Sequence, residues 1–319
     1  MGMAEFEEKL RVLVEHAWDG EIKWPIVEAW LNNFTGEYLE KGEEKEYFLF
    51  FLTKFIYFSK PLMRQMLRAL FRDHIKSPLC QRIRRNLGDT YKRSDIINLY
   101  EQEIRATRFV GMGNPAESGA HLLYYFRQIN YLPKDFFVDM AGAFDKNFDP
   151  LKRETKTSPR DANVRRYVFF DDLVGSGSQA ESYLSQLLKE VKKDNAHLDF
   201  RFISLFSTKQ GLKVLNKPSL FNGKATCLFE LDDSYKAFSD VSRYFASPPE
   251  WFDRDKLEGL THCYGTKLYP RFPLGYKNGQ LLLGFSHNTP DNTPPVFWCE
   301  GHRVPWHPVF IRYDKIYGG

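Results

Sequence analysis

The most constraining feature of the chain is an apolar run, Tyr167–Phe170, that leads directly into two acidic residues and a turn of small residues. The segment continues Asp171, Asp172, Leu173, Val174, Gly175, Ser176, Gly177, Ser178, Gln179. A short apolar run bounded by turn residues is typical of a buried strand. Residues 179–193 then repeat apolar side chains at helical spacing, which predicts a helix. A strand, a tight turn and a helix in this order indicate an α/β fold.

The turn has the composition of an anion-binding loop. Gly175 and Gly177 permit backbone angles that bulkier residues resist. Successive backbone N–H groups can then point at one anion, at the positive end of the helix dipole. Ser176 and Ser178 add hydroxyl donors, and Gln179 closes the loop. We therefore expect residues 175–179 to bind a phosphate group.

The two carboxylates beside this loop indicate a ligand with more than a phosphate. Asp171 and Asp172 would repel a bare phosphate, but they can accept hydrogen bonds from sugar hydroxyls or help to hold a cation such as Mg²⁺ indirectly. A ribose 5-phosphate group meets both demands, because it carries hydroxyls and a phosphate together. The alternative is structural: an acidic strand end followed by a Gly/Ser turn that caps a helix.

Apolar runs alternate with helical patterns through the middle of the chain. Strands are predicted at 107–112, 136–140, 167–170, 200–206, 226–231 and 281–285, and helices at 43–58, 95–105, 118–131, 179–193 and 208–215. This alternation predicts a parallel sheet covered on both faces. We expect a helical N-terminal region at 1–105, an α/β core at 106–245, and an irregular extension rich in aromatic residues and proline at 246–319 that packs on the core.

A second turn, after the predicted strand at 107–112, offers another set of donors. These are Gly113, Asn114, Ser118 and Gly119. They stand at the start of a predicted helix, where they would bind an anion or only cap the turn.

Charged residues near both turns are further candidates. Glu117 would act as a general acid or base, or as a helix-start carboxylate stabilised by the dipole. Arg127, on the helix at 118–131, would reach a phosphate or pair with Glu117 or Glu181. The stretch 145–166 is the least periodic in the chain, which predicts a mobile loop. Its Lys152 and Arg153 would bind the substrate, or would lie on a solvated loop.

The segment 167–179 resembles the phosphoribosyl pyrophosphate-binding motif of the phosphoribosyltransferases. That motif is an apolar run, two acidic residues, two apolar residues and a Thr/Ser-Gly-Ser/Thr turn. The resemblance implies a sheet of the phosphoribosyltransferase type. It also implies that Asp171 and Asp172 bind the ribose hydroxyls and that residues 175–179 wrap the 5-phosphate, with Mg²⁺ on the pyrophosphate. The chain departs from the motif at Gln179, where the family usually has a Thr that closes the loop, and at Gly175, where the family usually has a small or hydroxyl residue. These departures put ordinary nucleotide salvage in doubt.

Finer blocks resemble the PRTase-CE family of prokaryotic conflict systems. These blocks are residues 113–119, 124–128, 170–179 and 285–298, and the resemblance runs from about residue 45 to the end. It implies an antiphage effector that acts on a ribose phosphate or nucleotide, by ribosyl transfer or by cleavage of an N-glycosidic bond. The alternative is a non-catalytic module that binds a nucleotide or phosphoribosyl ligand.

Composition limits the partners. The formal charge of +4 is too small and too scattered to indicate a nucleic-acid-binding face. The most apolar early stretch, residues 47–63, is too short and too charged to cross a bilayer, and the first residues lack a signal-peptide pattern, so we expect a cytoplasmic protein. The helical N-terminal region is a candidate surface for a sensor or antitoxin protein.

Overall fold

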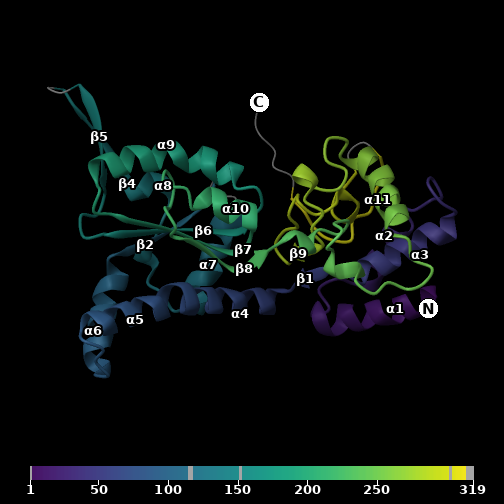
Figure 1. Cartoon of the computed structure of the whole chain (residues 1–319), viewed down its shortest axis with the longest axis horizontal. Coiled ribbons are helices and arrows are strands. Elements are labelled where there is room, and N and C mark those ends of the chain that lie inside the picture. Colours follow the sequence, from purple (N-terminus) through teal and green to yellow (C-terminus); the bar gives the residue numbers. More distant parts are fainter. Residues whose placement is uncertain (1, 114–117, 151–152, 302–303, 314–319) are drawn as a thin grey trace. The chain divides into compact units, whose positions relative to one another are not determined.

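The computed structural model describes residues 2–113, 118–150, 153–301 and 304–313 (Figure 1). The chain forms two compact units. The first, here called the aromatic unit, combines Met1–Met63 with Leu231–Gly319, and the second, the α/β unit, is Arg64–Glu230. Among the described residues, no helix is long and apolar enough to span a bilayer.

This division differs from the one expected from the sequence. The C-terminal extension pairs with the N-terminal helices, whereas residues 64–105 join the α/β unit. The physical reason is aromatic packing. Trp30 stacks on Phe297 with ring centroids 5.6 Å apart, and Phe55 stacks on Phe310 at 4.0 Å. Such pairs bury large apolar surfaces, and local periodicity cannot reveal which distant ring is the partner.

The aromatic unit contains helices and one small sheet. Its elements are α1 (Met3–Val12), the π-helical turn Leu13–Ala17, α2 (Trp24–Leu31), α3 (Lys41–Leu52), β1 (Ile56–Phe58), the 3-10 turns Asp233–Tyr235, Arg243–Phe245, Tyr276–Asn278 and Pro295–Phe297, α11 (Arg254–Leu268) and β9 (Leu283–Phe285). The predicted helix at 43–58 ends at Leu52, and Ile56–Phe58 pairs in parallel with Leu283–Phe285. The apolar pattern of residues 56–58 is compatible with a helix or a strand. Pairing with β9, which is distant in the sequence, stabilises the strand.

A buried carboxylate organises the start of α3. Glu44 is fully buried and accepts hydrogen bonds from the backbone N–H groups of Gly36, Tyr38 and Leu39 and from the hydroxyl of Tyr264. Four donors compensate for the lost hydration of this charge. Burial, together with this hydrogen bond, raises the pKa of Tyr264 to about 12, so the phenol remains a donor at neutral pH.

The α/β unit is built on a central sheet. Its elements are α4 (Lys60–Phe71), the π-helical turn Arg72–Lys76, α5 (Ser77–Asn86), α6 (Arg93–Arg105), β2 (Thr107–Gly111), α7 (Ser118–Ile129), the 3-10 turn Lys134–Phe136, β3 (Phe137–Val138), α8 (Met140–Ala143), β4 (Phe144–Asp149), β5 (Glu154–Pro159), β6 (Arg166–Val174), α9 (Ser178–Asp194), β7 (Asp199–Thr208), α10 (Lys209–Leu215) and β8 (Ala225–Leu231).

The sheet has the order β3-β2-β6-β7-β8, and β3, β2, β6 and β7 are parallel. Helices α9 and α10 lie on one side of it and α7 on the other (Figure 1). Leu184 and Leu188 of α9 pack in one core with Tyr167 and Phe169, while Phe126 of α7 contacts Phe170. The predicted fold class, α/β with a parallel sheet and a helical N-terminal region, is confirmed.

The region expected to be a mobile loop, 145–166, holds a β-hairpin. β4 and β5 pair antiparallel, from Phe144↔Pro159 to Asp149↔Glu154. The end of α9 anchors β5: the Thr157 N–H donates to Asp194 Oδ2 at 2.9 Å, and Asn195 Nδ2 donates to the Thr157 carbonyl at 2.6 Å. These partners are nearly 40 residues away in the sequence, so the missing periodicity of the stretch indicated a loop and could not reveal the anchor.

Candidate functional site

In the sheet, β2 lies between β3, the next strand in the chain, and β6. The chain therefore runs from β2 to β3 on one side and then crosses to β6 on the other side, so the strand order reverses between β2 and β6. Ligands of open α/β sheets bind outside the carboxyl ends of the strands at such a switch point. The β2–β6 ladder ends at Gly111↔Phe170, and the Met112 N–H adds one bond to the Phe170 carbonyl at 2.9 Å. Beyond this point β6 continues to Val174, paired with β7. The edge of residues 171–174 that faces β2 is therefore the candidate ligand site of this sheet.

The Gly/Ser turn begins where β6 ends. Gly177 has a φ of +73° and is the N-cap residue of α9. A Cβ at this position would lie 2.9 Å from Val214 Cβ and 3.2 Å from the Gly211 carbonyl oxygen. Both the left-handed backbone and the close packing require glycine here. The turn thus aims the first N–H groups of a 17-residue helix at the switch point.

The connection from β7 to α10 supports the turn from below. Thr208 Oγ1 donates to the Gly175 carbonyl at 2.6 Å and accepts from the Gly211 N–H at 3.0 Å. A Cβ on Gly211 would lie 2.5 Å from the Gly175 carbonyl oxygen, so no larger residue fits there without a shift. Neither Thr208 nor Gly211 is among the residues that the sequence predicts for this site. In the sequence, a Thr followed three residues later by Gly at a helix start indicates only a helix cap. It does not indicate that these residues contact the turn at Gly175.

The two serines of the turn contact each other. Ser176 Oγ and Ser178 Oγ lie 2.8 Å apart, and the Ser178 N–H is 3.5 Å from Ser176 Oγ. Gln179 is exposed on the first turn of α9. The contact preorganises the turn, because both hydroxyls and the backbone N–H groups already lie on one short bend.

The acidic pair is placed differently from what the sequence suggested. β6 extends through Asp171 and Asp172, so the carboxylates lie within the strand and not after its end. Successive side chains of a strand leave on opposite faces, and the exposure alternates accordingly: Asp171 is half-buried, whereas Asp172 is 9% exposed. Asp171 Oδ1 accepts from the Asp172 N–H at 2.9 Å, and Asp172 Oδ1 accepts from the Leu173 N–H at 2.7 Å. The two acids therefore have unequal access to a ligand.

The turn after β2 lies beside the first turns of α9. Gly113 has a φ of +82°, and its carbonyl accepts from the Tyr183 hydroxyl of α9 at 3.4 Å. A Cβ on Gly119 would lie 3.0–3.1 Å from backbone atoms of Met112 and Phe170, so α7 starts in close contact with β2 and β6. Both candidate anion turns thus border the switch point, and Tyr183, which was not a predicted site residue, connects the turn after β2 to α9.

Several predicted site residues lie elsewhere or outside the described residues. Asn114, Glu117 and Lys152 are not among the described residues, nor is the side chain of Ser118. Arg153 is exposed, with a φ of +51°, where β5 is about to begin.

Arg127 lies nine residues beyond the start of α7, which is about 13 Å along the helix axis. This places it beyond reach of a ligand held at the N-terminus of α7, and its guanidinium lies 5.7 Å from the ring centroid of Tyr124 instead. Glu181, one of its expected partners, pairs with Lys217 at 2.5 Å. No group of three or more His, Cys, Asp or Glu side chains that could hold a metal occurs among the described residues.

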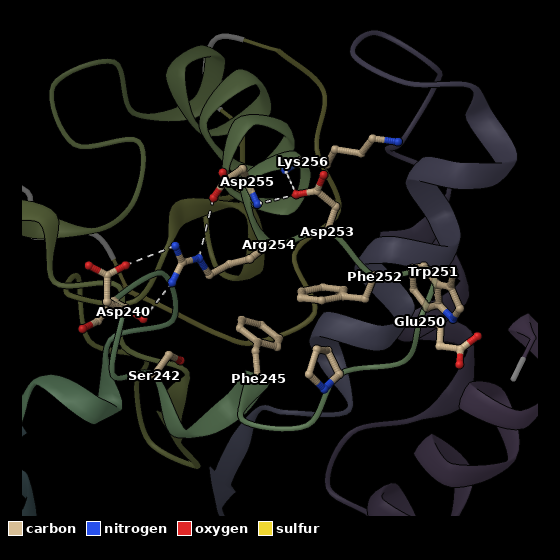
Figure 2. A pocket seen from close by; sticks show the side chains of 12 residues that line it. Asp240, Ser242, Phe245, Glu250, Trp251, Phe252, Asp253, Arg254, Asp255 and Lys256 are labelled. Atoms are coloured by element: carbon tan, nitrogen blue, oxygen red, sulfur yellow. Dashed lines mark hydrogen bonds and ion pairs between the residues drawn. The ribbon is translucent and has the colours of Figure 1, made fainter.

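A cavity of about 650 Å³ in the aromatic unit is a competing candidate (Figure 2). Its charged residues are largely engaged with each other: Arg254 contacts Asp240 at 3.2 Å and Asp255 at 3.7 Å, and Asp253 caps α11 through the N–H groups of Asp255 and Lys256. The floor carries the packed rings of Phe245 and Phe252. These contacts stabilise the start of α11, and they present no constellation of catalytic groups.

Comparison with solved structures gives distant similarities to phosphoribosyltransferases. The xanthine-guanine-hypoxanthine phosphoribosyltransferase of Helicobacter pylori is 15% identical, with a TM-score of 0.29 over 64% of this chain and 96% of that one. The adenine phosphoribosyltransferase of Leishmania donovani is 14% identical, with a TM-score of 0.27 over 55% and 65%. The orotate phosphoribosyltransferase of Aeropyrum pernix is 10% identical, with a TM-score of 0.25 over 41% and 64%. No curated protein matches the chain significantly.

The family model named PRTase-CE matches residues 27–312, which is most of the chain and includes every candidate site residue. The resemblance predicted from the blocks at 113–119, 124–128, 170–179 and 285–298 is thereby confirmed. The chain belongs to the PRTase-CE family and contains a phosphoribosyltransferase-like domain.

Proposed function

We propose that the α/β unit binds a 5-phosphoribosyl group and acts at its anomeric carbon, by ribosyl transfer or by cleavage of an N-glycosidic bond. One observation carries the proposal: the Gly177 turn at the start of α9 and the carboxylates of β6 lie together at the switch point of a parallel sheet. A phosphate and the hydroxyls of one sugar are the ligand groups that these two features complement.

In this proposal, the turn and the acidic residues bind different parts of the ligand. Residues 175–179 hold the 5-phosphate through backbone N–H groups, which need no side-chain charge. Asp171, the more exposed acid, accepts from a ribose hydroxyl, and its negative charge stabilises the positive charge that develops on the ribosyl ring. Asp172, which is buried, stabilises the backbone of the strand by accepting from the Leu173 N–H.

These residues could hold Mg²⁺ only through water molecules of its hydration shell. Carboxylate oxygens are suitable ligands, but Asp171 and Asp172 leave the strand on opposite faces, so they would not both coordinate one ion. When bound to a pyrophosphate leaving group, the ion would supply charge neutralisation. Asp171 would then orient water molecules of its hydration shell.

The double substitution Asp171→Asn with Asp172→Asn tests the function. Calorimetry with phosphoribosyl pyrophosphate and common nucleotides, followed by product analysis, should show binding and turnover in the wild type and neither in the double variant. Asp135→Asn, an exposed acid of the same unit, is the control and should behave as the wild type. Turnover that survives in the double variant would contradict the mechanism.

A non-catalytic module is the second candidate function. Gln179 replaces the Thr that usually closes the phosphoribosyltransferase loop, and such a change leaves backbone phosphate binding intact while altering side-chain chemistry. Binding of phosphoribosyl pyrophosphate or a nucleotide without any product would establish this function and exclude the enzyme.

The biological role we propose is that of an effector in antiphage defence, on the strength of the PRTase-CE membership. Metabolite profiling of cells that express the wild type and the double variant tests this role. Loss of one nucleotide class in cells with the wild type alone would identify the substrate. Identical metabolite pools in both would contradict an effector that consumes nucleotides.

A further inference from the structure

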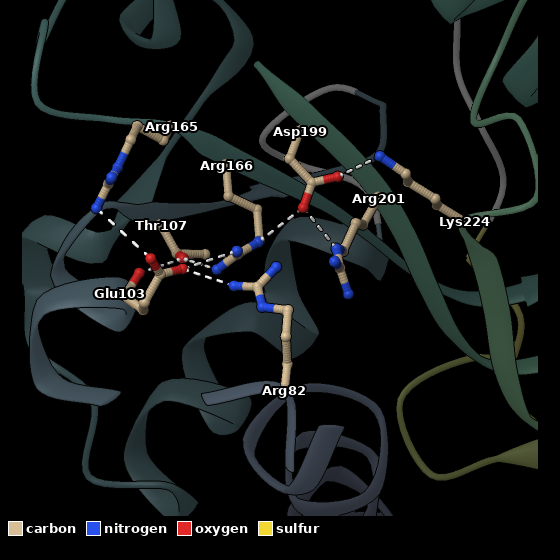
Figure 3. A network of polar contacts seen from close by, with 8 residues as sticks. All are labelled: Arg82, Glu103, Thr107, Arg165, Arg166, Asp199, Arg201 and Lys224. Carbon is tan, nitrogen blue, oxygen red and sulfur yellow. Dashed lines mark hydrogen bonds and ion pairs between the residues drawn. The ribbon is translucent and has the colours of Figure 1, made fainter. Parts of the chain in front are cut away.

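The amino edge of the same sheet carries a dense network of charges (Figure 3). Arg166, the first residue of β6, contacts Glu103 of α6 at 3.0 Å and Asp199, the first residue of β7, at 2.9 Å. Arg82 and Arg165 also contact Glu103, at 2.7 and 3.6 Å. Arg201 and Lys224 also contact Asp199, at 2.9 and 2.8 Å.

Positive charge exceeds negative charge in this network. The cations are Arg82, Arg165, Arg166, Arg201 and Lys224, and the carboxylates are Glu103 and Asp199. Three positive charges therefore have no carboxylate of their own. The side chain of Arg166 is only 9% exposed, so part of this excess lies where water screens it weakly. An excess of this kind favours an anionic ligand.

Three of the guanidinium side chains converge on one recess. Arg82, Arg166 and Arg201 line a cavity of about 40 Å³, whose remaining wall is formed by Ile75, Pro78 and Leu79. Arg82 uses Nη2 for Glu103, and Arg201 uses Nε for Asp199. Among the described residues, the other N–H groups of Arg82 and Arg201 find no acceptor. The recess thus presents guanidinium N–H donors that can bind the oxygens of an anionic group.

The recess is distinct from the proposed phosphoribosyl site. Arg166 and Asp171 lie on the same strand, five residues apart, and a strand rises about 3.3 Å per residue. The two positions are therefore about 16 Å apart along β6. One phosphate cannot contact both.

We infer that the recess between Arg82 and Arg201 is a second anion site, which binds one phosphate group of a small phosphorylated ligand. A single water needs about 10–15 Å³, so the cavity admits the oxygens of one anionic group and not a nucleobase. The apolar wall excludes water from one side and strengthens the attraction. Arg165 and Lys224, which are more exposed, are available for the rest of the ligand at the rim.

Calorimetry with inorganic pyrophosphate tests the inference on the full chain. The wild type should bind at two sites, one at each end of β6. The variant Arg82→Gln with Arg201→Gln should lose one of them, with affinity reduced about tenfold for each lost guanidinium. Glu103 keeps Arg165 and Arg166 in this variant, and Asp199 keeps Arg166 and Lys224, so the network should still fold.

Two controls make the outcome specific. Arg93→Gln removes an exposed arginine of α6 and should leave both sites intact. Arg201→Lys, in the wild-type background, keeps the charge but loses the fork, and should weaken binding less than Arg201→Gln. Thermal unfolding of each variant confirms that it is folded.

The result also separates this inference from the proposed function. If the Gly/Ser turn binds no pyrophosphate, the wild type shows one site and the Arg82→Gln, Arg201→Gln variant none, and the inference stands. Unchanged binding in that variant would overturn it. So would a short single-stranded oligonucleotide that binds this recess more tightly than pyrophosphate, since the ligand would then be nucleic acid.

Discussion

The two ends of strand β6 show two ways in which one sheet can attract an anion. At the carboxyl end, the turn 175–178 contains no charged side chain and offers backbone N–H groups at a helix start. At the amino end, arginines surround two carboxylates and a small recess. Backbone donors are fixed by the fold and need no counterion, whereas guanidinium groups must be held in place by carboxylates. The first kind of site depends on glycine geometry and the second on charge balance.

The two ends of β6 also contribute to the stability of the fold in different ways. The turn requires special backbone angles, so a change there costs strain. The network requires paired charges, so a change there leaves carboxylates without partners. Variants at the two ends of β6 should therefore lose stability for different reasons.

Gly177→Ala should have the largest effect. The left-handed backbone costs a non-glycine residue about 1–2 kcal/mol, and the contact with Val214 adds overpacking, for a total of about 3 kcal/mol in unfolding free energy. Ligand binding at the turn should be lost as well. Gly223→Ala is a matched control, because Gly223 has a φ of +78° but no atom within 4 Å of its Cβ position. It should cost only about 1 kcal/mol in urea denaturation. Equal costs for the two variants would show that the packing against Val214 is unimportant.

Arg166→Gln should destabilise the amino end by about 2–3 kcal/mol. The substitution leaves Glu103 and Asp199 partly buried with weaker compensation, although each keeps other cationic partners. Arg165→Gln, at a side chain that is 63% exposed, should change the free energy by less than about 0.5 kcal/mol. Urea denaturation of both variants measures the difference, and a similar loss in both would contradict a central role for Arg166.

The network should also make stability depend on pH. Burial acts to raise the pKa of the Asp199 carboxyl, but hydrogen bonds from Lys224 and Arg166 and the charge of Arg201 outweigh it, so the pKa lies well below its usual value. A depressed pKa contributes stability above the unfolded-state pKa of about 4, and this contribution is lost as the pH falls below that value.

Asp199→Asn tests this dependence. The wild type should be more stable than the variant at pH 6, and the difference should shrink by pH 3. Denaturation curves at several pH values measure it. A difference that stays constant over this range would contradict a charge-based contribution from Asp199.

Tyr183→Phe should have the smallest effect. The hydrogen bond from the Tyr183 hydroxyl to the Gly113 carbonyl is long, at 3.4 Å, and the side chain is 43% exposed. We expect a loss of about 0.5 kcal/mol in stability and a modest loss of ligand affinity, because the turn after β2 would be held less firmly against α9. Tyr131→Phe, at a fully exposed tyrosine of the same unit, should change neither. A large loss of affinity with no loss of stability would instead indicate direct contact of Tyr183 with the ligand.

The carboxyl end of β6 could be predicted from the sequence because its parts are contiguous. The apolar run 167–170, the acids, the Gly/Ser turn and the helix that follows occupy one stretch of about 25 residues. Each part has a local signature: burial for the strand, glycine for the left-handed turn, and helical spacing for α9. The prediction missed the extent of β6, since the ladder with β7 carries the strand past the acids.

The amino end and the division of the chain could not be predicted in this way. Arg82, Glu103, Arg166 and Asp199 come from four separate elements, and isolated charges of this kind are usually solvated. The same holds for the support of the turn by Thr208 and Gly211.

Local sequence thus determined the class of the fold, the strand–turn–helix segment and its family resemblance, because propensity and glycine geometry act over a few residues. Tertiary structure alone decided which residues lie beside that segment, the opposite faces taken by Asp171 and Asp172, the hairpin of β4 and β5, and the joining of both chain ends in one aromatic unit. Side-chain packing and charge pairing act through space, and the partners they select are distant in the chain.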